Sequence, residues 1–182
     1  MDIKVGHCWR FVTINTHSSW LPGDERGFRN RDHRIHSSGD YKNPPPKDEH
    51  AGLRKFNQDN STQMVKISKL LRSIIGLAII ARLKKEGYRI LAISVSFDHV
   101  HILVELPDDI PTIKRIMGRC KRNACEAVKH EMPGTIWSSG GDWKPVDDQE
   151  RQDNSYNYVL TKQRPRAWTW SFKDGQTQAL LD

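Results

Sequence analysis

The chain has 182 residues, enough for one ordinary domain with a buried core and too few to make two domains the default expectation. Its 29 Lys and Arg against 22 Asp and Glu give a formal net charge of +7, which favours a polyanionic partner, nucleic acid first, over an acidic small molecule. No apolar run approaches the ~20 residues of a membrane span, and three cysteines without a CxxC pair exclude a disulfide framework and a zinc knuckle, so we expect a cytoplasmic protein.

The first predicted element is a strand over residues 8–15, followed by a long insertion. The strand residues alternate between two faces, with Trp9, Phe11 and Thr13 on one face and Arg10, Val12 and Ile14 on the other. The insertion, at about 16–60, is basic and rich in turn residues, and we expect it to be a loop. It mixes arginines with aromatic residues, as a surface that clamps a phosphate backbone and stacks bases would, although a solvated linker is the alternative. The arginines assigned to DNA binding in this insertion are Arg26, Arg29 and Arg31.

The region from residue 61 to residue 146 is predicted to hold two helices and three strands. Helical spacing of apolar residues predicts a helix that begins at Ser61 or Thr62 and ends at Gly87. Two strands over 88–96 and 99–106 then form an antiparallel hairpin. The remaining two elements are a helix over 111–130 and a strand over 135–146 that is interrupted at Gly140 and Gly141.

A last helix is expected to begin after Asp147 or Asp148 and to run to about Gln163, followed by a Trp-rich tail at 164–182. The order strand, helix, strand, strand, helix, strand, helix within a single domain 1–182 is typical of an α+β, ferredoxin-like split βαβ sandwich. In this fold a four-stranded antiparallel sheet carries two helices on one face and leaves the other face for the additional C-terminal helix. Trp168 and Trp170 fit a short added strand or a base-stacking platform, and packing against the sheet is favoured.

The clearest functional feature is a pair of histidines, His99 and His101, in the strand that follows Phe97. Because strand side chains alternate with a period of two, both imidazoles lie on one face, while Val100 and Ile102 point to the other. Two imidazoles supply part of the coordination shell of a divalent metal ion and leave positions open for a substrate oxygen. The alternative is two half-exposed histidines on an inert sheet surface.

Basic residues indicate where a nucleic acid would bind. The helix over 111–130 carries cations around its apolar face with only Glu126 as an acidic counterweight, and the tail adds two arginines. Such a basic rim is also typical of a solvated helix surface. The residues assigned to DNA binding in these two regions are Lys114, Arg115, Arg119, Lys121, Arg122, Arg164 and Arg166.

Four stretches resemble a known family, the single-tyrosine HUH transposases of bacterial insertion sequences (IS200-like) and their REP-associated relatives. FDHVHILVELP at 97–107 resembles the histidine–hydrophobic–histidine strand of that family, and YVLTKQ at 158–163 resembles its nucleophile helix. FVTINTHSSWLPGDERGF at 11–28 is similar to the first strand and following loop in one branch, and IWSSGGDWKPV at 136–146 is similar to the fourth strand. The resemblance covers most of the chain outside about 33–60.

The resemblance implies a DNA strand-transferase that recognises a palindrome folded as a hairpin in single-stranded DNA. The tyrosine would cleave the strand with the help of Mg²⁺ or Mn²⁺, forming a 5′-phosphotyrosine and freeing a 3′-hydroxyl that later rejoins strands without ATP. By position, His99 and His101 would be metal ligands and Tyr158 the nucleophile. The enzyme would be nucleoid-associated and would act as a monomer or as a homodimer that exchanges the tyrosine helix.

Two positions depart from the pattern of this family. Members often carry a polar third ligand four residues after the tyrosine, where this chain has Lys162, so that Gln163 becomes the candidate ligand. Tyr156 is a rival nucleophile, since it shares a helix face with Gln163. The departure at Lys162 keeps open a non-catalytic, domesticated DNA-binding protein on the same fold, and a metal-dependent phosphodiesterase that uses water is a third hypothesis.

Overall fold

The computed structural model describes residues 3–28, 36–39, 43 and 45–173, and it divides into two compact units. The first unit combines residues 1–16 with residues 66–182, and the second spans residues 17–65. The first unit contains the sheet and three helices, and the second contains α1 (Ala51–Asn60). In the described part of the chain, no helix combines the length and the apolar composition that crossing a membrane requires.

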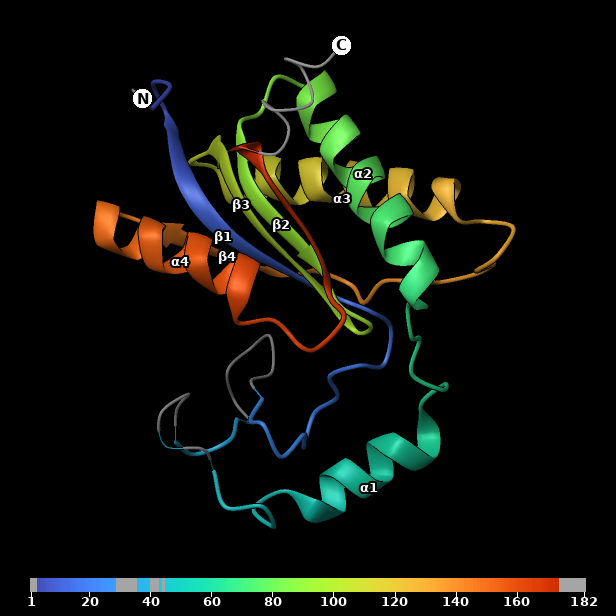
Figure 1. Cartoon of the computed structure of the whole chain (residues 1–182). Coiled ribbons are helices and arrows are strands. Elements are labelled where there is room, and N and C mark those ends of the chain that lie inside the picture. Colours follow the sequence, from blue (N-terminus) through green and yellow to red (C-terminus); the bar gives the residue numbers. More distant parts are fainter. Residues whose placement is uncertain (1–2, 29–35, 40–42, 44, 174–182) are drawn as a thin grey trace. The chain divides into compact units, whose positions relative to one another are not determined.

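The first unit is built on an antiparallel sheet of five strands in the order β4-β1-β3-β2-β5 (Figure 1). The strands are β1 (His7–Asn15), β2 (Ile90–Val95), β3 (His99–Pro107), β4 (Asp142–Val146) and β5 (Trp168–Ser171). Strands β1 to β4 follow the element order expected of the α+β sandwich. The expected number of four strands is wrong, because the Trp-rich tail adds β5 to the outer edge of β2, where Trp168 pairs with Val95 and Trp170 with Ile93.

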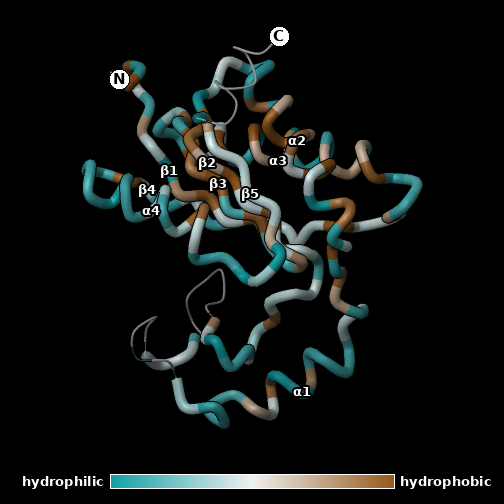
Figure 2. The backbone as a smooth tube through the Cα atoms, viewed as in Figure 1, coloured by the Kyte–Doolittle hydropathy of each residue, from teal (hydrophilic) through white to brown (hydrophobic). Residues whose placement is uncertain are grey.

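Helices cover both faces of this sheet. The helices α2 (Lys69–Lys85) and α3 (Ile110–Ala127) pack on one face, and α4 (Gln149–Thr161) lies across the other (Figure 1). Four alternate residues of β1 and β3 are fully buried toward α2 and α3, namely Val12, Ile14, Val100 and Ile102. Figure 2 shows hydrophobic residues concentrated in the central strands and in α2, whereas α4 is hydrophilic over most of its length.

The predicted helix starts are right for two of these helices and wrong for the third. Asp109 caps α3 by accepting a hydrogen bond from the Thr112 amide at 2.8 Å, and Asp148 caps α4 by accepting from the Arg151 amide at 2.7 Å. By contrast, α2 begins at Lys69 and not at residue 61 or 62. The preceding segment is extended, since the Ile67 amide donates to the Phe97 carbonyl at 2.7 Å.

The second unit contains a helix that the sequence does not predict. α1 occupies part of the segment expected to be a loop, yet none of its residues is buried, and the Phe56 side chain is 63% exposed. Helix prediction relies on a stripe of apolar residues that face a core, and α1 lacks such a stripe. A helix without a buried apolar face is therefore missed by this signal.

The contact between β5 and α2 requires glycine at position 76. The Trp168 ring lies so close that a Cβ on Gly76 would overlap its ring carbons. We expect Gly76→Ala to lower the free energy of unfolding by about 1–3 kcal/mol, the usual cost of overpacking. Gly118→Ala is the matched control in α3, where a Cβ would meet nothing within 4 Å, and it should stabilise the protein by up to about 1 kcal/mol. Denaturant titration measures both values, and equal stability of the two variants would contradict this packing.

Candidate functional site

The two histidines of β3 lie side by side on the face of the sheet that α2 and α3 leave open. Their ring centroids are 4.6 Å apart. The His99 side chain is 17% exposed and the His101 residue 8% exposed. The buried residues Val100 and Ile102 hold the strand from the opposite face. The pair is therefore anchored by the core and only partly open to solvent.

Both imidazoles are held through their Nδ1 atoms. His99 Nδ1 lies 2.7 Å from Asp98 Oδ1, and His101 Nδ1 lies 3.0 Å from the Thr13 hydroxyl, which stands opposite it on β1. An ionised carboxylate can only accept, so His99 donates from Nδ1, and in the neutral ring Nε2 is then the atom with the lone pair. The Thr13 hydroxyl can accept from His101 in the same way. This arrangement is the one found around metal-binding histidines, in which a second partner fixes the tautomer and the ring orientation.

The environment of His101 keeps its ring neutral. Burial and, to a smaller extent, the neighbouring His99 and Lys144 lower the pKa of His101 to about 3, while attraction to Asp98 acts in the opposite direction. A neutral imidazole is the form that binds metal ions. The ring therefore keeps its donor electron pair throughout the neutral pH range.

Tyr158 lies beside the histidine pair. Its ring centroid is 5.6 Å from that of His101 and 5.8 Å from that of Phe11, both with edge-on geometry. The residue is 43% exposed, so the aromatic ring packs on the sheet while part of the side chain remains accessible to solvent. Val159, the buried residue of α4, anchors the helix at this point.

Tyr156 has a different environment. It packs against a hydrophobic cluster of Trp9, Leu103 and Val146 on the same face of the sheet. Its ring also lies 6.2 Å from the Phe172 ring, and the Lys173 ammonium lies 5.8 Å from its centroid. These contacts indicate a packing role for Tyr156, whereas those of Tyr158 bring it to the histidines.

Gln163 is engaged at the end of α4. Its side-chain amide donates to the Tyr158 carbonyl at 2.8 Å, and the Lys162 amide donates to the same carbonyl at 3.1 Å. In the described residues no group of three His, Cys, Asp or Glu side chains is arranged to hold a metal ion. The structure thus brings together His99, His101 and Tyr158, and Gln163 serves there as a helix-end hydrogen-bond donor.

The cations of α3 belong to the other layer of the molecule. Arg119 forms an ion pair with Glu86 at 2.6 Å, and Lys121 donates to the carbonyls of Ser138 and Gly140. Lys114, Arg115 and Arg122 are exposed. Because α3 packs on the opposite face of the sheet, none of these five side chains lines the histidine face. Their position therefore does not support a contact with a nucleotide bound at that face.

The arginines of the insertion are only partly described. Arg26 stacks on Trp20, with its guanidinium 4.3 Å from the ring centroid, and pairs with Asp24 at 2.6 Å. Arg29 and Arg31 lie outside the described part of the chain. Arg26 is therefore held by partners within its own unit.

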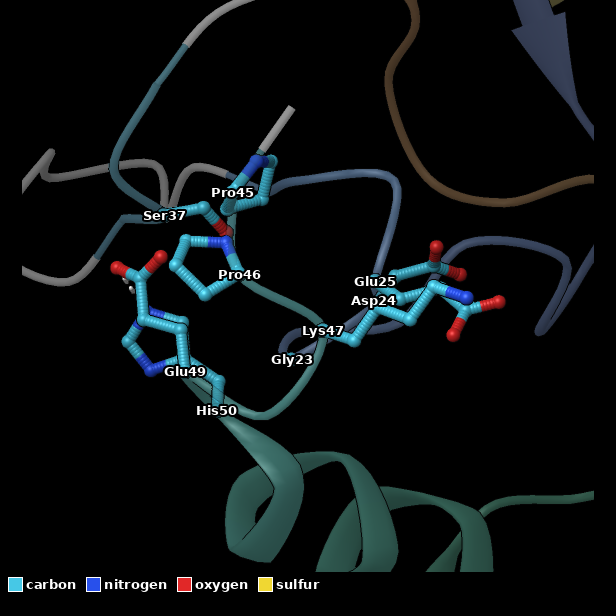
Figure 3. Close-up of a pocket in the computed structure, with 9 residues that line it drawn as sticks. All are labelled: Gly23, Asp24, Glu25, Ser37, Pro45, Pro46, Lys47, Glu49 and His50. Atoms are coloured by element: carbon cyan, nitrogen blue, oxygen red, sulfur yellow. Dashed lines mark ion pairs between the residues drawn. The ribbon is translucent and has the colours of Figure 1, made fainter. Parts of the chain in front are cut away.

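The insertion also contains a small pocket, shown in Figure 3. The carboxylates of Asp24 and Glu25 lie on one side of it and that of Glu49 on the other. Three carboxylates against Lys47 and His50 are a poor match for a phosphate group. The pocket is lined by Gly23, Asp24, Glu25, Ser37, Pro45, Pro46, Lys47, Glu49 and His50.

Several residues at the site are not predicted by the sequence. Asp98 and Thr13 hold the histidines. Lys144 of β4 pairs with Phe11 of β1, so its side chain lies on the same face of the sheet as Phe11 and the histidines. Arg164, expected only as a DNA-binding residue, lies with its guanidinium 3.5 Å from the Asp98 carboxylate. The DHVH sequence was a signal for Asp98, because a carboxylate often accompanies a metal-binding histidine. Thr13 and Lys144 depend on strand register, for which the sequence carries no direct signal.

Comparisons with known proteins find similarity among solved structures. No protein-family model and no curated protein matches the chain. One such structure is that of a REP-associated tyrosine transposase bound to a REP hairpin, with a TM-score of 0.44 and 18% sequence identity. The similarity covers 87% of this chain and 67% of the other.

Proposed function

We propose that this protein is a DNA strand-transferase of the single-tyrosine HUH type, which cleaves and rejoins single-stranded DNA through a 5′-phosphotyrosine at Tyr158. The observation that carries the proposal is the position of Tyr158 beside the histidine pair. Its ring centroid lies 5.6 Å from that of His101, and both His99 and His101 are held through Nδ1. A partly exposed phenol beside two oriented, available imidazole nitrogens is a combination of nucleophile and phosphate-orienting site.

The covalent step conserves the number of phosphodiester bonds. The phenol oxygen of Tyr158 attacks the phosphorus, the phosphorus–O3′ bond breaks, and the phenol proton is released while the 3′-oxygen takes up a proton. The DNA then carries a phosphotyrosine at its 5′ end and a free 3′-hydroxyl. The reverse attack by a 3′-hydroxyl restores the phosphodiester and the tyrosine, so strand joining needs no ATP.

A divalent ion, Mg²⁺ or Mn²⁺, fits the donor set of His99 and His101. Both Nδ1 atoms are occupied by protein partners, so the Nε2 atoms of the two neutral rings would be the atoms that hold the ion. Such an ion supplies charge neutralisation and orientation of the scissile phosphate when it is bound. Gln163 is the proposed third ligand, and in that role its side chain would have to leave the Tyr158 carbonyl.

Hairpin DNA is the proposed partner, and the cations on the histidine side of the sheet are the proposed contacts to the cleaved strand. Lys144 faces this side from β4, and Lys162, Arg164 and Arg166 follow Tyr158 in an exposed segment. The exposed Lys114, Arg115 and Arg122 of α3 remain candidates for contacts with a part of the DNA distant from the scissile phosphate. An enzyme with this substrate would act in the cytoplasm, at the nucleoid.

A covalent-adduct assay tests the proposal. The protein is incubated with single-stranded hairpin oligonucleotides and Mn²⁺, and the products are separated on a denaturing gel. A protein–DNA adduct supports the strand-transferase, and cleavage without an adduct would instead indicate a phosphodiesterase that uses water. Binding without cleavage would indicate a non-catalytic DNA-binding protein. This alternative is favoured because no group of three His, Cys, Asp or Glu side chains in the described part of the chain is arranged to hold a metal ion.

Hairpin binding is expected to depend strongly on salt. Each phosphate that a Lys or Arg neutralises releases counterions, so binding through several of these cations should weaken by roughly 10³-fold between low and moderate salt. Fluorescence anisotropy of a labelled hairpin across a salt series measures the slope. A flat slope would mean that the basic residues do not contact the phosphate backbone.

A further inference from the structure

We propose that Asp98 and Arg164 act as positioning residues that join the end of the tyrosine helix to the first histidine of the pair. The catalytic part of this inference rests on the proposed function, and the part that concerns the His99 ring does not. No feature of the sequence assigns these two residues to one another, since they are 66 positions apart and meet only in the folded unit.

The Asp98 carboxylate connects two elements. It is 4% exposed, and its Oδ1 atom accepts from His99 Nδ1 at 2.7 Å, while Oδ2 lies 3.5 Å from Arg164 Nη2. The backbone is fixed as well, because the Asp98 carbonyl accepts from the Thr16 amide at 2.9 Å and from the Thr16 hydroxyl at 3.1 Å. One oxygen of the carboxylate thus contacts the histidine strand, and the other faces Arg164 in the segment that follows α4.

Arg164 holds the other side of this connection. Its guanidinium lies 4.8 Å from the centroid of the Phe97 ring, which is within the range of a cation–π interaction. The segment between Tyr158 and Arg164 is short and is closed by the Gln163 and Lys162 hydrogen bonds to the Tyr158 carbonyl. Docking of Arg164 on Phe97 and Asp98 therefore restrains the helix turn that carries Tyr158.

Two consequences follow from this arrangement. The Asp98 carboxylate accepts from Nδ1 and so fixes the His99 tautomer with hydrogen on Nδ1, which leaves Nε2 as the donor atom of the neutral ring. The ion pair with Arg164 keeps the tyrosine turn in register with the histidine pair, and a displacement of about 1 Å at a reacting group can cost about 10²-fold in rate. A carboxylate that only completed the buried hydrogen bonds of its own turn would produce neither effect.

The experiment uses Asp98→Asn and Arg164→Gln in the full chain, with Arg151→Gln as the matched control. Arg151 forms an exposed ion pair with Asp147 at 3.2 Å at the other end of α4, so its variant removes the same kind of pair away from the site. Circular dichroism establishes that each variant is folded. Arg164 is exposed, so its variant tests the connection even if Asp98→Asn fails to fold.

The first readout is independent of DNA. Nitrogen-15 NMR of the His99 ring at about pH 8, where an ordinary imidazole is neutral, should show hydrogen on Nδ1 in the wild type and a mixture or the other tautomer in Asp98→Asn. Mn²⁺ affinity, measured by electron paramagnetic resonance, should fall by about 10- to 100-fold in Asp98→Asn. An unchanged His99 tautomer in Asp98→Asn would overturn the role of Asp98, whether or not the wild type forms an adduct.

The second readout is the rate of adduct formation at saturating hairpin DNA. Arg164→Gln should lower this rate by about 10- to 100-fold, and Arg164→Lys should restore part of it, with Arg151→Gln unchanged. The double variant of Asp98 and Arg164 should be less impaired than the product of the single effects, because both substitutions break one connection. A normal saturated rate with weaker binding would make Arg164 a DNA contact only and overturn its positioning role. If the wild type forms no adduct, the proposed function fails while the NMR result still decides the role of Asp98.

Discussion

Tyr158→Phe is expected to abolish the covalent adduct with hairpin DNA while the protein stays folded and binds the hairpin normally. The substitution removes only the hydroxyl, and the ring contacts with Phe11 and His101 are retained. Because the hydroxyl oxygen is the atom proposed to form the bond to phosphorus, adduct formation should fall by at least about 10³-fold. The measurement is the adduct band on a denaturing gel after incubation with Mn²⁺.

Tyr156→Phe is the comparison for this variant. Tyr156 packs against Trp9, Leu103 and Val146, so the loss of its hydroxyl should leave adduct formation close to that of the wild type. Mass spectrometry of the digested adduct locates the modified residue directly. Adduct formation by Tyr158→Phe at the wild-type rate would assign the nucleophile to another residue.

The second large effect is expected from the histidine pair. His99→Gln and His101→Gln keep a polar side chain of similar size but remove the imidazole nitrogen proposed to hold the metal ion. Loss of a phosphate-orienting ion is worth several kcal/mol, so the rate at a fixed Mn²⁺ concentration should fall by at least about 10²-fold. The rate of adduct formation, measured across a Mn²⁺ titration, should require a higher concentration for each variant.

His130→Gln is the control for the histidine variants. His130 is exposed and follows α3, behind the sheet, so its replacement should not change the Mn²⁺ requirement. Hairpin binding in the absence of metal separates a loss of DNA affinity from a loss of metal-dependent chemistry. Identical Mn²⁺ titrations for the wild type and both site variants would show that the ion is bound elsewhere.

Much of the fold follows from patterns that depend on near neighbours in the sequence. The alternation in residues 8–15 and 99–106 predicts the two central strands, and Asp147 and Asp148 mark where α4 begins. The start of α2 is missed because Val65 and Ile67 match helical spacing, whereas long-range backbone hydrogen bonds hold this segment in an extended form. β5 likewise depends on pairing with β2, which the tail sequence alone does not determine.

The candidate site divides in the same way. The shared face of His99 and His101 follows from the two-residue period of a strand, and the predicted fold places the C-terminal helix on the same side of the sheet. The alternation that buries Val100 and Ile102 against α2 and α3 also sends the histidines away from α3. The same alternation can be read from the sequence, and it places the cations of α3 on the opposite side of the sheet from the histidines. Thr13 and Lys144 could not be found, because their places depend on the register of β1 with two other strands.

The attachment of α4 has a consequence for how copies of this chain associate. The chain enters α4 from β4 at one edge of the sheet and continues from α4 into β5 at the opposite edge, so the helix is attached to the sheet at both ends. Donating α4 alone to a second copy would require the β5 ladder to open, at about 0.5–1.5 kcal/mol for each hydrogen bond lost. Within this topology Tyr158 lies against the sheet that carries His99 and His101 of the same chain.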